Sequence, residues 1–230
     1  MITFSIIIPF QSKDPYRIKA LQVVMNYYKT LFPNTDIIIA SNGSDHYSKS
    51  SAINKAVKKT NTEYIAIIDA DILCPKNTML SGLKLLESFP LILPYNNVCD
   101  LYRHMSEVLY DKPNYSLSTS MLHGKNRHNK KSVPVGGINL IKKTCFIKIK
   151  GFDERFIGWG GEDDAFVAAC DTICGPHKRL TGDIYHLWHP PKKAKTNPFY
   201  SNNHRIVSEY FLAYYKKEEM MKILSKRKGI

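Results

Sequence analysis

Short runs of β-branched apolar residues alternate with amphipathic segments through the first part of the chain, and this alternation limits the fold more than any other feature. The segments 15–31 and 48–59 carry apolar residues at helical spacing and predict helices. The apolar runs predict buried strands at Ile6–Ile8, Asp36–Ala40 and Tyr64–Ile68. Strands that alternate with helices form a mostly parallel sheet flanked by helices. We therefore expect a single α/β domain.

Three polar loops follow the three predicted strands. They are Pro9–Lys13, Ser41–Ser44 and Asp69–Asp71. In a doubly wound sheet, ligands bind beyond the carboxyl ends of the strands. The three loops are therefore expected to face one crevice.

Asp69 and Asp71 come directly after the apolar strand 64–68, with Ala70 between them. Alternation along an extended chain aims both carboxylates to the same side, where their charges repel unless a cation lies nearby. Hard cations such as Mg²⁺ or Mn²⁺ prefer oxygen ligands and keep positions open for substrate phosphates. The pattern predicts a divalent metal site, although a solvated acidic turn would look the same.

The segment Gly158–Asp164 combines three glycines, an indole and three consecutive carboxylates. Glycine permits close backbone approach to a ligand, and a tryptophan face can stack on a sugar ring. A carboxylate here can act as a general base. A glycine-rich loop before an acidic helix start is the structural alternative.

His186 and His189 flank Trp188 in a third polar segment. Neutral imidazole is a good ligand for ions of the Mn²⁺ type beside carboxylates. We expect at least one of the two histidines to bind the metal.

The chain has 230 residues, with 33 Lys and Arg against 20 Asp and Glu and a formal net charge of +13. Such an excess attracts nucleic acid, an anionic membrane or phosphate-bearing substrates. Zinc-finger spacing, RNA-binding aromatic motifs and basic-zipper regions are absent from the sequence, so no specific nucleic acid partner is expected. An odd number of cysteines, five, without a signal peptide favours reduced thiols.

The two ends of the chain bear on its location. The apolar start lacks a basic region and is too short to span a membrane, so we expect a cytoplasmic protein without a signal peptide or transmembrane segment. A helix is expected from about residue 206, ending in a basic tail over Lys222–Lys228. This segment is interpreted either as a solvated, frayed tail or as a peripheral contact with an anionic membrane.

The polar segments, in this order, resemble the GT-A glycosyltransferases, in particular the β-1,4-galactosyltransferases and the galactosyltransferase-like C-terminal domain that polypeptide GalNAc-transferases and chondroitin polymerases also contain. The likeness covers about residues 3 to 205 and rests on Ile6–Phe10, Asp69–Asp71, Gly136–Gly137, Gly151–Asp153, Trp159–Asp164 and Tyr185–His186.

The resemblance implies a function for individual residues. The donor nucleotide would be bound by Pro9, Phe10, Lys13, Tyr47, Lys49, Asn54, Asp69 and Ala70. The donor and acceptor sugars would be bound by Gly137, Trp159, Gly160, Gly161, Glu162 and Asp164. Asp163 would be the catalytic base, and the metal would be held by Asp71 and His186, with His189 in reserve. Pro134 and Val135 stand where galactosyltransferases have Tyr-Phe, which argues against assuming galactose as the donor sugar.

The resemblance also implies a division of the chain and an activity. Residues 1–205 would form the GT-A domain, with a nucleotide-binding half at 1–95 and an acceptor and metal half at 132–205, followed by a C-terminal helix and tail at 206–230. The activity would be Mn²⁺- or Mg²⁺-dependent, inverting transfer of a hexose or N-acetylhexosamine from a UDP-sugar to a glycan or lipid-linked acceptor, as in polysaccharide biosynthesis. The alternatives are a non-catalytic carbohydrate- or polyanion-binding protein on the same fold and a sugar-nucleotide-forming nucleotidyltransferase.

Overall fold

A six-stranded sheet forms the centre of the protein. The computed structural model describes residues 2–44, 46–112, 117–127, 133–158, 160–191 and 197–227. In spatial order the sheet consists of β2 (Ile37–Ala40), β1 (Phe4–Pro9), β3 (Tyr64–Ile68), β8 (Ile138–Lys142), β5 (Leu91–Leu93) and β9 (Lys178–Arg179). Only β8 runs against the other strands of this sheet. The predicted mostly parallel sheet in an α/β fold is therefore confirmed.

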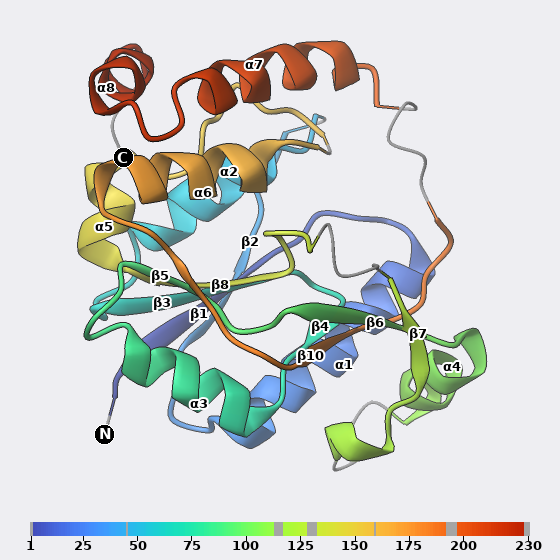
Figure 1. The fold of residues 1–230 in the computed structure, drawn as a ribbon. Helices are drawn as coiled ribbons and strands as arrows, with labels where there is room; N and C mark the ends of the chain where they lie inside the picture. Colours follow the sequence, from blue (N-terminus) through green and yellow to red (C-terminus); the bar gives the residue numbers. More distant parts are fainter. Residues whose placement is uncertain are drawn as a thin grey trace.

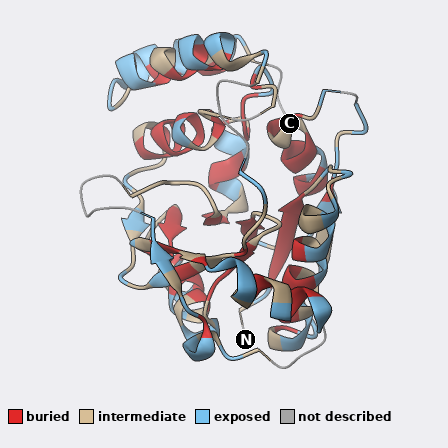
Figure 2. Ribbon diagram, turned by 90° about the vertical axis from the view of Figure 1, so that its right-hand side faces the viewer, coloured by how far each residue is buried: buried red, intermediate tan, exposed pale blue. Residues whose placement is uncertain are grey.

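Alternate residues of each central strand face opposite helical layers, as the period of a β-strand requires. Ile6 and Ile8 pack into one hydrophobic cluster, and Ile7 packs into the other. The first cluster includes residues of α1 (Pro15–Leu31) and α3 (Lys76–Leu85). The second includes residues of α2 (Lys49–Val57), α5 (Lys143–Lys148), α6 (Glu162–Ile173), α7 (Tyr200–Leu212) and α8 (Lys217–Ser225). Figure 1 shows α7 and α8 beyond α6, and Figure 2 shows the buried strands between the helices.

A second, smaller sheet lies beside the first and was not predicted. Its order is β4 (Ile72–Leu73), β10 (Asp183–His186), β6 (Asn97–Leu101) and β7 (Gly124–Asn126). The register places His186 opposite Ile72 on one side and opposite Asp100 on the other. The segment α4 (Arg103–Asp111) follows β6, and a 3₁₀ turn (Thr119–Met121) precedes β7. This sheet therefore brings three distant parts of the chain to the end of β3.

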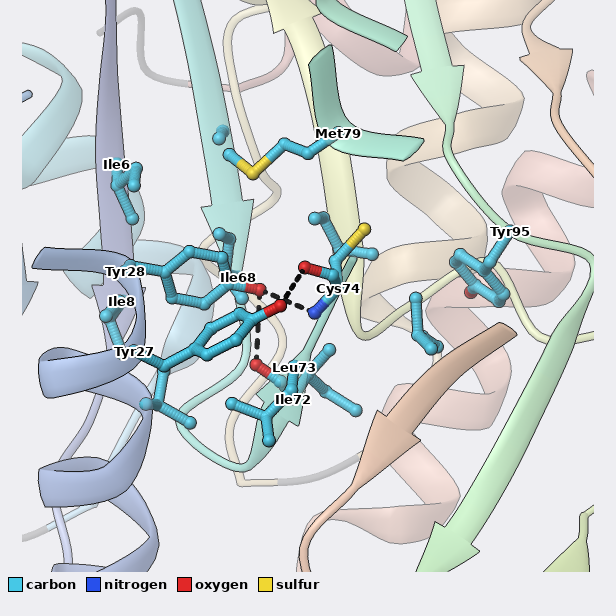
Figure 3. Packing of buried hydrophobic residues seen from close by; sticks show 14 of the residues in the cluster. Ile6, Ile8, Tyr27, Tyr28, Ile68, Ile72, Leu73, Cys74, Met79 and Tyr95 are labelled. Atoms are coloured by element: carbon cyan, nitrogen blue, oxygen red, sulfur yellow. Dashed lines mark hydrogen bonds between the residues drawn. The ribbon is translucent and has the colours of Figure 1, made fainter. Parts of the chain in front are cut away.

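Two tyrosines of α1 fix the start of the small sheet. The hydroxyl of Tyr27 donates to the Cys74 carbonyl at 2.9 Å. The hydroxyl of Tyr28 donates to the Ile72 carbonyl at 3.3 Å and accepts from the Cys74 amide at 3.0 Å (Figure 3). Buried backbone groups need such partners, and these satisfy the short strand that follows Asp71. Helix α1 thus holds the backbone next to that carboxylate.

The C-terminal segment is packed rather than frayed, which corrects one of the two interpretations of the tail. Helix α7 already begins at Tyr200, so the expected boundary between residues 205 and 206 falls inside it. Helix α8 buries Met220 and Leu224, and the Arg227 guanidinium donates to two backbone carbonyls of residues 150 and 151 at 2.7 and 2.8 Å. Residues 228–230 lie outside the described part of the chain.

The expectation of five reduced thiols is wrong. Cys145 of α5 and Cys174 at the end of α6 are joined by a disulfide. Cys170 lies against it, with its Sγ 3.3 Å from that of Cys145. Cys170 and Cys174 are four residues apart, so both lie on the side of α6 that faces α5. The number of cysteines in the sequence did not reveal the disulfide.

Among the described residues, no helix combines the length and the apolar content that crossing a membrane requires.

Candidate active site

Asp71, His186 and His189 meet at the end of β3, and their ligand atoms all lie within 4.8 Å of one another. The Nε2 atom of His189 is 3.2 Å from Asp71 Oδ2, and that of His186 is 3.7 Å from the same oxygen. The sequence left open which histidine would join Asp71. The structure brings both to it.

The second nitrogen of each ring has its own acceptor. His186 Nδ1 is 2.9 Å from Asp100 Oδ1, and His189 Nδ1 is 3.1 Å from the Pro190 carbonyl. A proton on each Nδ1 leaves a lone pair on each Nε2, so two lone pairs face the Asp71 carboxylate. These groups repel one another unless the rings gain a proton or a cation lies near them, and the Arg17 guanidinium, 3.2 Å from His189 Nε2, is one such cation. One carboxylate and two imidazole nitrogens are a donor set that fits Mn²⁺.

Burial works to raise the pKa of Asp71, but His186, His189 and Arg17 outweigh it and hold that pKa below its usual range. The carboxylate therefore keeps its negative charge, which a metal ligand requires.

Asp100 of β6 orients His186 and is itself held by Arg127. The Arg127 guanidinium contacts both carboxylate oxygens of Asp100, with Nε at 2.9 Å from Oδ2. Burial raises the pKa of Asp100, but the hydrogen bonds from His186 and Arg127 outweigh it and keep the pKa low. Such a carboxylate behind a ligating histidine fixes the tautomer and the ring orientation. The sequence analysis missed both residues because their proximity depends on the pairing of β6 with β10.

A second cluster surrounds the ammonium group of Lys49 and includes Asp69, the residue that directly follows β3. This nitrogen is 3.0 and 2.9 Å from the two Asp163 oxygens, 2.9 Å from Asp69 Oδ1 and 3.6 Å from Glu162 Oε1. One cation thus faces three carboxylates. Lys49 was expected to bind the donor nucleotide, and its pairing with the expected base was not predicted.

Asp163, which the resemblance implies as the catalytic base, has a raised pKa. Burial, together with the charges of Glu162 and Asp69, raises the pKa of Asp163 to about 7 in spite of the Lys49 ammonium. The pKa of Lys49 is also raised, because Asp163, Asp69 and Glu162 outweigh the opposing effect of burial. A base with a pKa near the working pH accepts and releases a proton most effectively.

Local backbone structure explains why these carboxylates gather. Gly161 caps the start of α6 with a left-handed φ of 88°, and Glu162, Asp163 and Asp164 fill the first turn. Carboxylates are favoured there by the partial positive charge of the helix N-terminus. A Cβ atom at Gly161 would lie 3.1 Å from both the Phe156 ring and Val207, so the turn also needs a residue without a side chain.

The glycine pair of residues 136 and 137 lies between Asp69 and Asp163. The Asp69 amide donates to the Gly137 carbonyl at 2.8 Å. A Cβ atom at Gly136 would lie 2.3 Å from Asp163 Oδ2, closer than a real contact permits. Gly137 adopts a φ of 90°, which side chains disfavour. The predicted proximity of Gly137 to a bound donor sugar stays a prediction.

Tyr95 and Arg179 hold the segment before this glycine pair. The buried Tyr95 hydroxyl donates to the Pro134 carbonyl at 2.7 Å and also contacts the Gly136 carbonyl. Arg179 donates to the Pro134 carbonyl at 3.1 Å. Neither residue was expected to support the site.

The remaining expected donor residues lie in or near the strand-end loops. Pro9 ends β1, and the Phe10 amide donates to the Ala40 carbonyl at 2.8 Å. The Gln11 side chain joins the first two loops by donating to the Ser44 carbonyl at 2.6 Å. Lys13 is exposed, and Ala70 packs partly buried between the two aspartates.

Tyr47 and Asn54 differ in whether their side-chain polar groups are already hydrogen-bonded within the protein. The Tyr47 hydroxyl is buried and finds no hydrogen-bond partner in the described part of the chain. The Asn54 amide is already bonded to the backbone of Phe152 at 2.9 Å through both of its ends. Asn54 therefore has a structural task, and its contact with the nucleotide stays a prediction.

The expected sugar-binding segment is partly described. The Gly160 amide donates to Glu162 Oε2 at 3.1 Å, and burial raises the pKa of Asp164. Trp159, which was expected to stack on the sugar, lies outside the described residues.

The fold and the arrangement of acidic and imidazole groups at its strand ends define the chain as a GT-A glycosyltransferase. The family model "Glycosyl transferase family 2" matches residues 19–149, which is more than half of the chain. The chain therefore belongs to glycosyl transferase family 2. A second model, described as "N-terminal domain of galactosyltransferase", matches residues 119–192. A comparison with curated protein sequences finds no significant match.

Solved structures share the fold at low sequence identity. A mutant of Drosophila β-1,4-galactosyltransferase 7 in complex with manganese, UDP-Gal and xylobiose is 18% identical, with a TM-score of 0.55 over 82% of this chain and 72% of that chain. Glucosyl-3-phosphoglycerate synthase from Mycobacterium tuberculosis with Mn²⁺, UDP-glucose and phosphoglyceric acid is 11% identical, with a TM-score of 0.55 over 94% and 80%. The same synthase with Mg²⁺ and UDP is 10% identical, with a TM-score of 0.50.

Proposed function

We propose that this chain transfers a hexose or N-acetylhexosamine from a UDP-sugar to a hydroxyl of a glycan or lipid-linked acceptor, with a divalent metal ion and with inversion at the anomeric carbon. The family membership supports sugar transfer. The structural neighbours that contain Mn²⁺ or Mg²⁺ with UDP or a UDP-sugar support the choice of donor and metal.

The metal would be held by Asp71, His186 and His189, since these offer one oxygen and two nitrogens toward a common point. A bound divalent ion neutralises the diphosphate of the donor and stabilises it as a leaving group. Asp100 would keep the Nε2 atom of His186 directed to the ion by holding Nδ1.

Asp163 would remove the proton from the acceptor hydroxyl. Its elevated pKa of about 7 allows it to take that proton near neutral pH. As the proton leaves, the acceptor oxygen bonds to the anomeric carbon and the bond to the diphosphate breaks. A single displacement of this kind inverts the centre and requires no second carboxylate as a nucleophile.

Lys49 would keep the base in place. Its ammonium contacts both oxygens of Asp163 and one of Asp69, so it ties α6 to the end of β3. Glu162 and Asp164, in the same turn as the base, would bind acceptor hydroxyls, and Trp159 would stack on the sugar.

The observation that carries this proposal is the pair of imidazole Nε2 atoms facing the Asp71 carboxylate, together with a partly buried carboxylate, Asp163, that has an elevated pKa and shares the Lys49 ammonium with Asp69. The test is a panel of UDP-sugars assayed for UDP release with Mn²⁺, with and without candidate acceptors. We expect release for at least one donor, its loss with EDTA, and its recovery when Mn²⁺ is added back. Release that is equal with EDTA and with Mn²⁺ would contradict the metal-dependent mechanism.

A further inference from the structure

Arg17 lies against the proposed metal ligands, and neither the sequence motifs nor the proposed mechanism has given it a task. It stands in the first turn of α1, three residues after the N-cap Asp14. Its NH2 atom is 3.2 Å from His189 Nε2 and 3.8 Å from Asp71 Oδ2. The guanidinium therefore places a permanent positive charge beside the atoms that would receive a divalent cation.

The hydrogen bonding of Arg17 is incomplete. Its Nε atom is buried and has no hydrogen-bond partner among the residues that the structure describes, while 36% of the side chain is exposed. A buried donor without an acceptor is unfavourable, and a guanidinium presents its donors in a fork that matches the oxygens of a phosphate. The side chain thus has unused donors next to the metal ligands and enough access for a ligand to reach them.

The charges of Arg17, Asp71 and a bound divalent ion limit which ligand could contact the free donors of Arg17. A divalent ion that joins Asp71 in the presence of Arg17 would bring two further positive charges to a site with one guanidinium and one carboxylate ligand. Like charges that close repel, and the guanidinium would also lose its ion pair with Asp71. An anion of two or more charges that contacts both the metal and the guanidinium removes this conflict, and a nucleoside diphosphate is such an anion.

We propose that Arg17 makes metal binding conditional on the nucleoside diphosphate, because its guanidinium leaves Asp71 for the phosphate oxygens when donor and metal bind together. This inference rests on the proposed function, since it assigns the donor diphosphate to the same site. In the absence of the diphosphate, Arg17 holds Asp71 and disfavours the metal. In its presence, Arg17 stabilises the complex.

The test measures Mn²⁺ binding to the wild-type chain by calorimetry or by electron paramagnetic resonance, with and without UDP. The variant Arg17→Met removes the charge and the donors but keeps an unbranched side chain. The matched control is Lys19→Met, because Lys19 is an exposed cation of the same helix that has no place in the proposed site. A second variant, Arg17→Lys, keeps the charge and loses the fork.

In the wild-type chain and in Lys19→Met, we expect UDP to tighten Mn²⁺ binding by about 5- to 150-fold, the usual range of coupling between two ligands. In Arg17→Met, Mn²⁺ alone should bind more tightly than to the wild type, and the effect of UDP should fall several-fold. In Arg17→Lys the effect of UDP should be intermediate. Thermal unfolding of each variant confirms that it is folded.

Two results overturn the inference in different ways. If the wild type binds Mn²⁺ and UDP but Arg17→Met keeps the full effect of UDP, Arg17 does not couple them and the proposed function stands. If the folded wild type binds neither Mn²⁺ nor UDP, the proposed function fails together with the inference.

Discussion

Replacing Asp100 by alanine tests how the metal site is oriented. The change removes the carboxylate that lies 2.9 Å from His186 Nδ1 and leaves Arg127 without its partner. The imidazole can then rotate or move its proton to Nε2, and either event removes one nitrogen from the metal. Loss of the partner behind a ligating histidine weakens metal affinity by about 10- to 100-fold, which equals about 1.4 to 2.7 kcal/mol.

The assay is a calorimetric titration of Mn²⁺ in the presence of UDP. The matched control is Asp183→Ala, because Asp183 lies in the same strand as His186 and its carboxylate accepts from Asn97 at 2.7 Å instead of contacting a proposed ligand. The control should bind Mn²⁺ like the wild type. If Asp100→Ala also binds Mn²⁺ with wild-type affinity, the structure does not explain how His186 is held.

Three further changes have expected outcomes. Asp163→Asn should lower kcat by about 10²- to 10⁴-fold. It should also abolish the rise in rate as the pH increases through about 7, because only the deprotonated carboxylate accepts a proton. A pH–rate profile with an unchanged rise would refute this assignment. Gly136→Ala should displace Asp163, because the new Cβ atom would lie only 2.3 Å from Asp163 Oδ2, and kcat should fall while far-ultraviolet circular dichroism stays native. Wild-type turnover would refute the packing argument. Tyr28→Phe should lower the free energy of unfolding by about 1 to 3 kcal/mol in urea, because the buried Cys74 amide loses its acceptor, and unchanged stability would count against that account.

The central sheet could be predicted because its signals are local. The strand 64–68 and the helix 15–31 have the predicted bounds, since an unbroken β-branched run and an apolar stripe at helical spacing each identify their own element. The smaller sheet escaped prediction because β4 has only two residues and β7 only three, which is too short for a periodic pattern.

The residues of the candidate site also fall into two groups, those that a local motif identifies and those that only the fold brings together. Asp71, Asp163 and the two histidines stand in distinctive strings, so sequence motifs singled them out. No motif singled out Arg17 or Asp100, because their contacts depend on the packing of α1 against β4 and on the register of β6 with β10. The disulfide between α5 and α6 likewise depends on how two helices pack.

The most direct test of the proposed site is electron spin-echo spectroscopy of Mn²⁺ bound together with UDP, since this method detects nitrogen nuclei coordinated to the ion. The structure predicts two imidazole nitrogens on Mn²⁺, one of which disappears in His186→Ala and the other in His189→Ala, and loss of the bound ion in Asp71→Ala. A spectrum of Mn²⁺–UDP without any nitrogen coupling, or one that both histidine variants leave unchanged, would show that the metal binds elsewhere and would contradict the proposed active site.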